Sequence, residues 1–252
     1  MKKPFFVLLS AISAWATSGY AAVLVGNVEV NPATSVTFSS GDTVDWAIWD
    51  TTDSTAVGSI SSTNTQSGGA GLISAITPFS TVSASPNTIR GVGGTTQEFS
   101  YSNGTSPTAQ SNASLGFVAN STLATAGRGV QLSIIGDPGQ LYQVNVWTVG
   151  FAGQGEMRAS LHNASTVVLS SEAFGSNGVN KASNLFSFEF MPDSISDLLT
   201  LSFHLQASGI GANGHVGIQA VTISAVPEPA SCVLLLGLGG LTLAFTNRRP
   251  RV

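Results

Sequence analysis

Alternating apolar and polar residues in the C-terminal half of the chain predict β-strands. Val130, Leu132 and Ile134 alternate with Gln131 and Ser133, and a period of two places successive side chains on opposite faces of a strand. The same alternation predicts strands over residues 141–147, 157–161, 166–169, 185–190, 198–205 and 216–223. Turn-forming residues separate these segments at intervals of about ten residues, which is typical of an all-β, antiparallel β-sandwich.

Two rows of large apolar side chains predict where the core of this sandwich lies. Each row occupies every second position of one predicted strand, so each forms one face of that strand. We expect the two rows to pack against each other. The rows consist of Phe186, Phe188 and Phe190, and of Leu199, Leu201, Phe203 and Leu205.

The N-terminal half has a less regular pattern. Residues 50–71 are dominated by Thr, Ser, Gly and Asn, which predicts a long exposed loop. Disorder is the competing interpretation for residues 54–71, because they contain few residues that could form a core. Segments rich in β-branched and aromatic residues predict strands over residues 23–30, 43–49, 72–76, 97–101 and 115–118.

The N-terminus has the order of features that defines a secretory signal peptide. Lys2 and Lys3 precede an apolar run over residues 5–16, and the small residues Gly19 and Ala21 follow. We expect an N-terminal signal helix over residues 1–21 that is cleaved after Ala21. An uncleaved anchor is the alternative, and the run is short for a membrane span of about 20 residues.

The C-terminal tail has three parts. Two prolines two residues apart cannot both continue a strand ladder, because proline lacks an N–H group, so the tail leaves the sheet as an extended segment. The fourteen uncharged residues that follow predict a transmembrane helix of only about 21 Å, which suits brief residence in a bilayer core of about 30 Å. Arginines after the apolar run favour the cytoplasmic face for this end. The parts are Val226, Pro227, Glu228 and Pro229, then residues 232–245, then Arg248, Arg249 and Arg251.

This tail resembles the PEP-CTERM sorting signal of Gram-negative bacteria, because Pro227, Glu228 and Pro229 match the motif that names the family. The resemblance implies an exosortase-type membrane enzyme as partner, a transient inner-membrane anchor, and delivery to the cell surface or extracellular matrix. Pro250 interrupts the arginines and departs from the family pattern. An ordinary single-span tail anchor is the alternative interpretation.

A second resemblance concerns the domain itself. Residues 141–225 resemble the galactose-binding-like jelly rolls of bacterial proteins whose closing strand runs into a sorting tail. This implies a jelly-roll topology for the sandwich. The expected organisation is therefore a signal peptide over residues 1–21, a β-sandwich over 22–225, and the sorting signal over 226–252.

Composition narrows the possible partners of the exported domain. Residues 22–225 contain four cations and twelve carboxylates, a formal charge of −8. Nucleic acid is disfavoured as a partner, because phosphate binding needs clustered Lys and Arg. Cys232 is the only cysteine and lies in the tail, so the domain forms no internal disulfide and depends on its core.

The candidate chemistry of the domain is sparse. His162, His204 and His215 lack the spacing of paired metal ligands, and no nucleophile or phosphate-loop motif is present, so we expect no metal, no cofactor and no catalysis. The tryptophans are candidate sugar contacts, because their rings can stack on sugars: Trp46, Trp49 and Trp147.

Four carboxylates flank the first two tryptophans, and we expect them mainly to cap turns. Calcium or sugar contact and catalysis are their alternative roles. They are Asp42, Asp45, Asp50 and Asp53.

The leading expectation is therefore a noncatalytic surface or matrix protein. One alternative is a carbohydrate-binding module that acts on exopolysaccharide. The other is a secreted glycan hydrolase, which needs two carboxylates placed across a sugar.

Overall fold

The computed structural model describes residues 22–30, 32–39, 41–82, 88–93, 97–114, 116–120, 125–162, 164, 166–174, 182–206 and 213–227. The predicted signal helix and transmembrane helix lie outside these residues. The regular structure of the described residues is β-strand throughout, which confirms the all-β prediction. None of it includes a helix long and apolar enough to cross a membrane.

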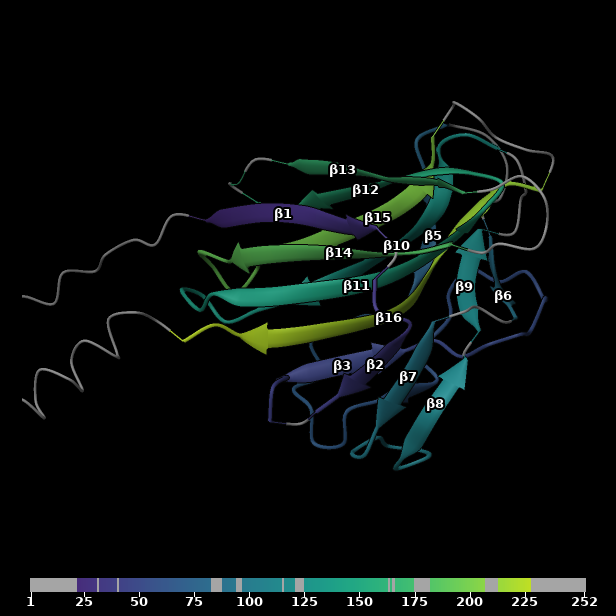
Figure 1. Cartoon of the computed structure of the whole chain (residues 1–252). Coiled ribbons are helices and arrows are strands. Elements are labelled where there is room, and N and C mark those ends of the chain that lie inside the picture. The colour runs from purple at the N-terminus through teal and green to yellow at the C-terminus, as the bar shows by residue number, and fades with distance from the viewer. Residues whose placement is uncertain are drawn as a thin grey trace, which may run out of the picture.

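The strands of the described residues form three sheets (Figure 1). The largest sheet contains β1 (Val23–Val30), β3 (Asp45–Ile48), β4 (Asn64–Thr65), β6 (Ile89–Val92), β9 (Phe117–Asn120), β11 (Tyr142–Phe151), β14 (Ala182–Met191) and β16 (His215–Ala225). The second contains β5 (Thr77–Ser80), β10 (Arg128–Ile135), β12 (Gly153–Ser160), β13 (Val167–Phe174) and β15 (Leu198–Leu205). The third contains β2 (Ser35–Phe38), β7 (Glu98–Tyr101) and β8 (Gln110–Ser114).

Eight of these strands have the topology of a jelly roll. One half of the sandwich has the order β3, β16, β11, β14, and the other has the order β10, β15, β12, β13. From β10 to β16 each connection passes from one sheet to the other, except for the hairpin between β12 and β13. Two interleaved sheets connected in this way define a jelly roll. The predicted topology is therefore confirmed.

The two apolar rows meet between the sheets, as predicted. Strands β14 and β15 follow each other in the chain but belong to different sheets, so their rows face each other across the sandwich. The rings of Phe186 and Phe203 lie 5.5 Å apart between centroids. All seven side chains of the two rows are completely buried.

The third sheet adds a layer that the sequence did not predict. It covers part of the outer face of the largest sheet and encloses a second apolar cluster. Its ladder between β2 and β7 is parallel, whereas the other ladders between described strands are antiparallel. As a result β3 and most of β16 are buried on both faces. The second cluster consists of Phe38, Trp46, Ile48, Phe99, Tyr101, Trp147 and Ala220.

The prediction of an exposed loop over residues 50–71 is wrong in part. This segment contains β4 and forms single bridges from Val57 to Ile89 and from Ile60 to Ile76. A strand predicted over residues 72–76 is also wrong, because this segment forms only isolated bridges and β5 begins afterwards, at Thr77. The sequence did not predict these contacts, because residues 50–71 contain few apolar residues and polar side chains supply much of their packing.

Asn64 is the centre of that polar packing. Its Nδ2 donates hydrogen bonds to the Tyr101 hydroxyl at 2.7 Å and to the Pro107 carbonyl at 2.9 Å. Its Oδ1 accepts the Thr105 N–H and the Thr105 hydroxyl, both at 2.9 Å. Only 5% of Asn64 is exposed, so one side chain ties β4 to the loop that follows β7.

Truncation of the inter-sheet contact should destabilise the domain strongly. Phe186→Ala removes a fully buried ring, and we expect a loss of about 4 kcal/mol in the free energy of unfolding. Val25→Ala is the control, because Val25 is 54% exposed and should change the free energy by no more than about 0.5 kcal/mol. Denaturant unfolding of both variants measures the difference, and similar values would contradict the assigned core.

Removal of the Asn64 amide should also destabilise the domain. Asn64→Ala leaves several buried donors and acceptors without partners, so we expect a loss of about 2 to 3 kcal/mol. The matched control is Asn27→Ala, because Asn27 is exposed on β1. Denaturant unfolding should leave the control near the wild type. A tolerant Asn64→Ala variant would show that the loop is held by other contacts.

Candidate functional site

The three predicted sugar-contact tryptophans lie inside the protein. Trp46 and Trp49 are 0% exposed and Trp147 is 5% exposed. The third sheet covers Trp46 and Trp147, whereas Trp49 belongs to the core between the two main sheets. A sugar can stack only on an accessible ring face, so their burial argues against the predicted contact role.

The carboxylates near these tryptophans anchor the backbone. Asp45 accepts the Leu72 N–H at 2.7 Å, and Asp50 accepts the Gly116 N–H at 2.7 Å. Burial raises the pKa of the Asp45 carboxyl above its ordinary value, against the opposing effect of its backbone hydrogen bonds. Asp53 accepts the Thr55 N–H at 2.9 Å. Only the Asp53 contact is a local turn of the predicted kind, since Asp45 and Asp50 bind backbone groups 27 and 66 residues away.

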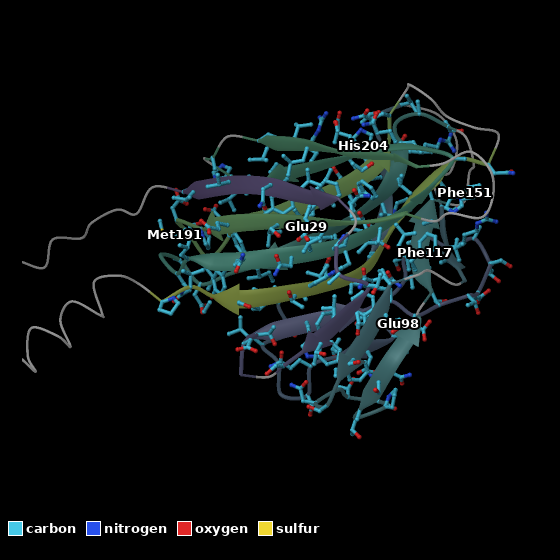
Figure 2. All side chains as sticks on the ribbon, in the orientation of Figure 1. Glu29, Glu98, Phe117, Phe151, Met191 and His204 are labelled. Atoms are coloured by element: carbon cyan, nitrogen blue, oxygen red, sulfur yellow. The ribbon has the colours of Figure 1, made fainter. Side chains whose placement is uncertain are left out.

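The three histidines have different surroundings. His162 is exposed, and its Nδ1 lies 3.3 Å from an Asp197 oxygen. His215 begins β16 and is stacked between the rings of Phe117 and Phe151, whose positions Figure 2 shows. His204 lies on β15. Within the described ranges, no group of three His, Cys, Asp or Glu side chains is arranged to hold a metal ion.

His204, which is labelled in Figure 2, lies in an open cleft on the second sheet. We call this the His204 cleft. Its volume is about 740 Å³. Its charged residues and its histidine come from two neighbouring strands, β12 and β15, whereas Thr81, Val82, Ala126 and Gly127 come from the segments beside β5 and β10. The lining consists of Thr81, Val82, Ala126, Gly127, Glu156, Arg158, His204, Leu205 and Gln206.

Strand register brings the charged residues of the cleft together. Glu156 pairs with His204 across β12 and β15, and Arg158 is two residues further along the same face of β12. An Arg158 nitrogen donates to a Glu156 oxygen at 2.9 Å. The same oxygen lies 3.5 Å from Nε2 of His204. The sequence did not predict this site, because only the register between β12 and β15 places these residues side by side, although polar residues do alternate with the apolar row of β15.

The His204 imidazole is held in its neutral form. Burial lowers its pKa below the ordinary value, and the charge of Arg158 acts in the same direction. The charge of Glu156 opposes these effects without reversing them. The ring is 5% exposed, and its Nδ1 has no hydrogen-bond partner in the described part of the chain. Near neutral pH this histidine therefore adds no charge to the cleft.

A glycine gives the His204 ring its aromatic neighbour. Gly129 pairs with Phe79 on one side and with His204 on the other. Because Gly129 has no side chain, the two rings meet above it, with centroids 5.2 Å apart. A Cβ at this position would overlap the carbonyl oxygen of Phe203. The close approach of the β15 backbone therefore requires glycine at this position.

A second polar depression lies on the largest sheet, and we call it the β14 groove. Its volume is about 300 Å³. The Ser187 hydroxyl donates to Asn145 Oδ1 at 2.7 Å at its edge. The groove contains a single carboxylate, Glu189. Its lining consists of Val25, Gly26, Asn27, Gln143, Ser187, Phe188 and Glu189.

The chain leaves the sheet at the start of the predicted sorting motif. The Val226 N–H donates to the Leu141 carbonyl at 2.8 Å, and the Val226 carbonyl accepts from the Gln140 amide at 3.1 Å. Pro227 follows as an exposed residue without strand structure. The remaining predicted motif and basic residues lie outside the described residues: Glu228, Pro229, Arg248, Arg249 and Arg251.

The first strand, β1, begins at the same end of the sandwich at which the last strand, β16, ends (Figure 1). Ala225 pairs with Tyr142, Tyr142 pairs with Phe190, and Phe190 pairs with Leu24. These four residues form one row across the largest sheet. We call this the tail end of the domain.

The His204 cleft lies toward the opposite end of the domain. In the second sheet, the pair formed by Ile135 and Leu198 lies at the tail end. Gly129 precedes Ile135 by six residues in β10 and pairs with His204. At about 3.4 Å per residue, this separation is about 20 Å along the strands. Figure 2 shows Met191 at the tail end and His204 away from it.

Comparisons with known proteins give one family match and several similar solved structures, including the following two. The solved structure of TmCBM61 in complex with β-1,4-galactotriose is 16% identical, with a TM-score of 0.32, and the alignment covers 46% of this chain and 73% of that chain. The enzymatically active domain of bacteriophage CBA120 tailspike protein 4 is 12% identical, with a TM-score of 0.33, and the alignment covers 62% of this chain and 20% of that chain. Among curated proteins, none matches this chain in sequence.

The family match falls on the tail. Residues 225–249 match the family described as the PEP-CTERM protein-sorting motif. The matched segment begins at the last residue of β16 and extends through the apolar run to the first two arginines. The chain therefore carries a PEP-CTERM protein-sorting motif at its C-terminal end, directly after the last strand of a jelly roll.

Proposed function

We propose that this chain is an exported, noncatalytic protein of the cell surface or extracellular matrix of a Gram-negative bacterium. In this proposal an exosortase-type membrane enzyme processes its tail after a transient stay in the inner membrane. The observation that carries the proposal is the PEP-CTERM match over residues 225–249. The proposed divisions are a signal peptide over residues 1–21, the jelly roll over 22–225, and the sorting signal over 226–252.

The way the chain leaves the sandwich supports this function. Val226 makes the last backbone hydrogen bonds of the described chain, and Pro227 has no N–H group to extend the ladder. The chain thus leaves the ladder at Pro227, the first residue of the Pro-Glu-Pro motif. A processing enzyme could grip this segment without unfolding the domain.

The cavities of the domain favour a noncatalytic role over the hydrolase alternative. A glycosidase needs two carboxyl groups on either side of the sugar bond. The His204 cleft contains only Glu156, and the β14 groove contains only Glu189. Neither of these two cavities offers the required pair.

Substitution of the motif should block processing of the tail. We expect a triple variant, Pro227→Ala, Glu228→Ala and Pro229→Ala, to accumulate as the unprocessed form in the inner membrane. Its processed surface or extracellular fraction should fall at least about tenfold, because the residues of the recognition motif are lost. Fractionation of the producing bacterium and mass spectrometry of the recovered protein measure this fall.

The matched control is Pro250→Ala, which changes a proline of the same tail outside the matched segment. It should be processed like the wild type. Equal processing and equal surface delivery of the triple variant would overturn the proposed sorting route. A uniform loss in both variants would instead indicate a general effect on the stability of the tail.

A further inference from the structure

We propose that the His204 cleft binds a sugar residue of a neutral polysaccharide. This inference goes beyond the sorting function and does not depend on it. It rests on the combination, in one open cleft, of a carboxylate, a guanidinium group, a neutral imidazole and an amide beside apolar side chains. The tryptophans that the sequence suggested for such a role take no part in it.

The charges of the cleft compensate each other. Arg158 and Glu156 form an ion pair at 2.9 Å, and His204 is neutral. The side chain of Arg158 remains 45% exposed and that of Glu156 remains 21% exposed, so both keep hydrogen-bonding capacity toward solvent. A guanidinium donates and a carboxylate accepts. A neutral ligand with many hydroxyl groups can use both, because each hydroxyl donates and accepts.

The two charged ligand classes fit less well. An anionic polysaccharide would approach a domain with a formal charge of −8, and the one guanidinium in the cleft is already paired. A metal ion would find a single carboxylate and a single imidazole in the cleft lining. The chemistry of the lining therefore favours an uncharged ligand.

The apolar part of the cleft suits the C–H face of a sugar ring. Val82, which is 46% exposed, supplies the accessible apolar side chain of the cleft. Phe79 is partly exposed and holds the His204 ring from the side. Small-ligand sites commonly combine an apolar lining with a few placed polar groups in about 300–1,000 Å³. The cleft, at about 740 Å³, lies in this range.

His204 lies next to the carboxylate of this site. Its Nε2 faces Glu156, while its ring is packed against Phe79. Packing alone does not favour an imidazole here, because a buried nitrogen without a partner costs free energy that an apolar side chain would avoid. We therefore assign His204 as a positioning residue for Glu156, which contacts the sugar.

Calorimetry of the full-length chain tests the proposal. The chain is purified in a detergent that has no sugar headgroup, and the probes are dextran, galactan, mannan and laminarin, with alginate as the anionic comparison. We expect binding to at least one neutral polysaccharide and none to alginate. Glu156→Gln and Phe79→Ala should each weaken the association constant at least about tenfold, the size of effect expected when one well-placed contact is lost.

The matched control is Glu189→Gln, the same substitution in the β14 groove on the other main sheet. It should bind within about twofold of the wild type, since a twofold change corresponds to less than about 0.5 kcal/mol. Thermal unfolding of each variant separates loss of binding from loss of the fold. If Phe79→Ala unfolds, Arg158→Gln replaces it, because the Arg158 side chain is half-exposed and its loss should spare the core.

Three results would overturn the proposal. The first is the absence of binding to all four neutral polysaccharides. The second is equal weakening by Glu189→Gln, which would move the site to the β14 groove. The third is preferential binding of alginate. None of these results depends on tail processing, so they are distinguishable from a failure of the proposed sorting route.

Discussion

The position of the last strand, β16, constrains the whole molecule. It lies between β11 and β3 and hydrogen-bonds to both. Residues 45–48 therefore pair with residues 220–223, so the jelly roll closes only when the two ends of the domain come together. Such distant pairing has a large entropic cost, which the buried side chains of β16 must offset. Since the domain contains no cysteine, side-chain packing and hydrogen bonds must supply that compensation.

The same strand connects the fold to the sorting motif. A tail attached to an edge strand could be pulled away together with that strand. Here the chain continues from a strand held by ladders on both sides, and Val226 is still bonded to the backbone of Leu141. The change from a residue bonded to the ladder to an exposed residue without strand structure therefore occurs between Val226 and Pro227. Proline makes this change sharp, because it cannot donate to the ladder.

The sequence predicted the features that rest on local alternation and missed those that rest on distant pairing. The rows of β14 and β15 were recognisable, because apolar side chains at every second position are typical of a buried strand face. Asn64 lies in a Thr- and Ser-rich segment that has the pattern of a loop, yet its hydrogen bonds make it a buried anchor. The residue type of Trp46 predicts a sugar contact, but the unpredicted third sheet covers this side chain. The His204 cleft depends on the register that places Glu156 opposite His204. Register between distant strands is set by tertiary pairing, so no local pattern could reveal it.

The arrangement of tail and cleft follows from the direction of the strands. The turn between β10 and β11 lies at the tail end, because Ile135 precedes it and Tyr142, the partner of Ala225, follows it. Gly129 lies near the other end of β10 and pairs with His204. About 20 Å of strand therefore lies between the tail end and the His204 cleft. The two proposed sites thus belong to opposite ends of the same strands, so a partner at one site leaves the other uncovered.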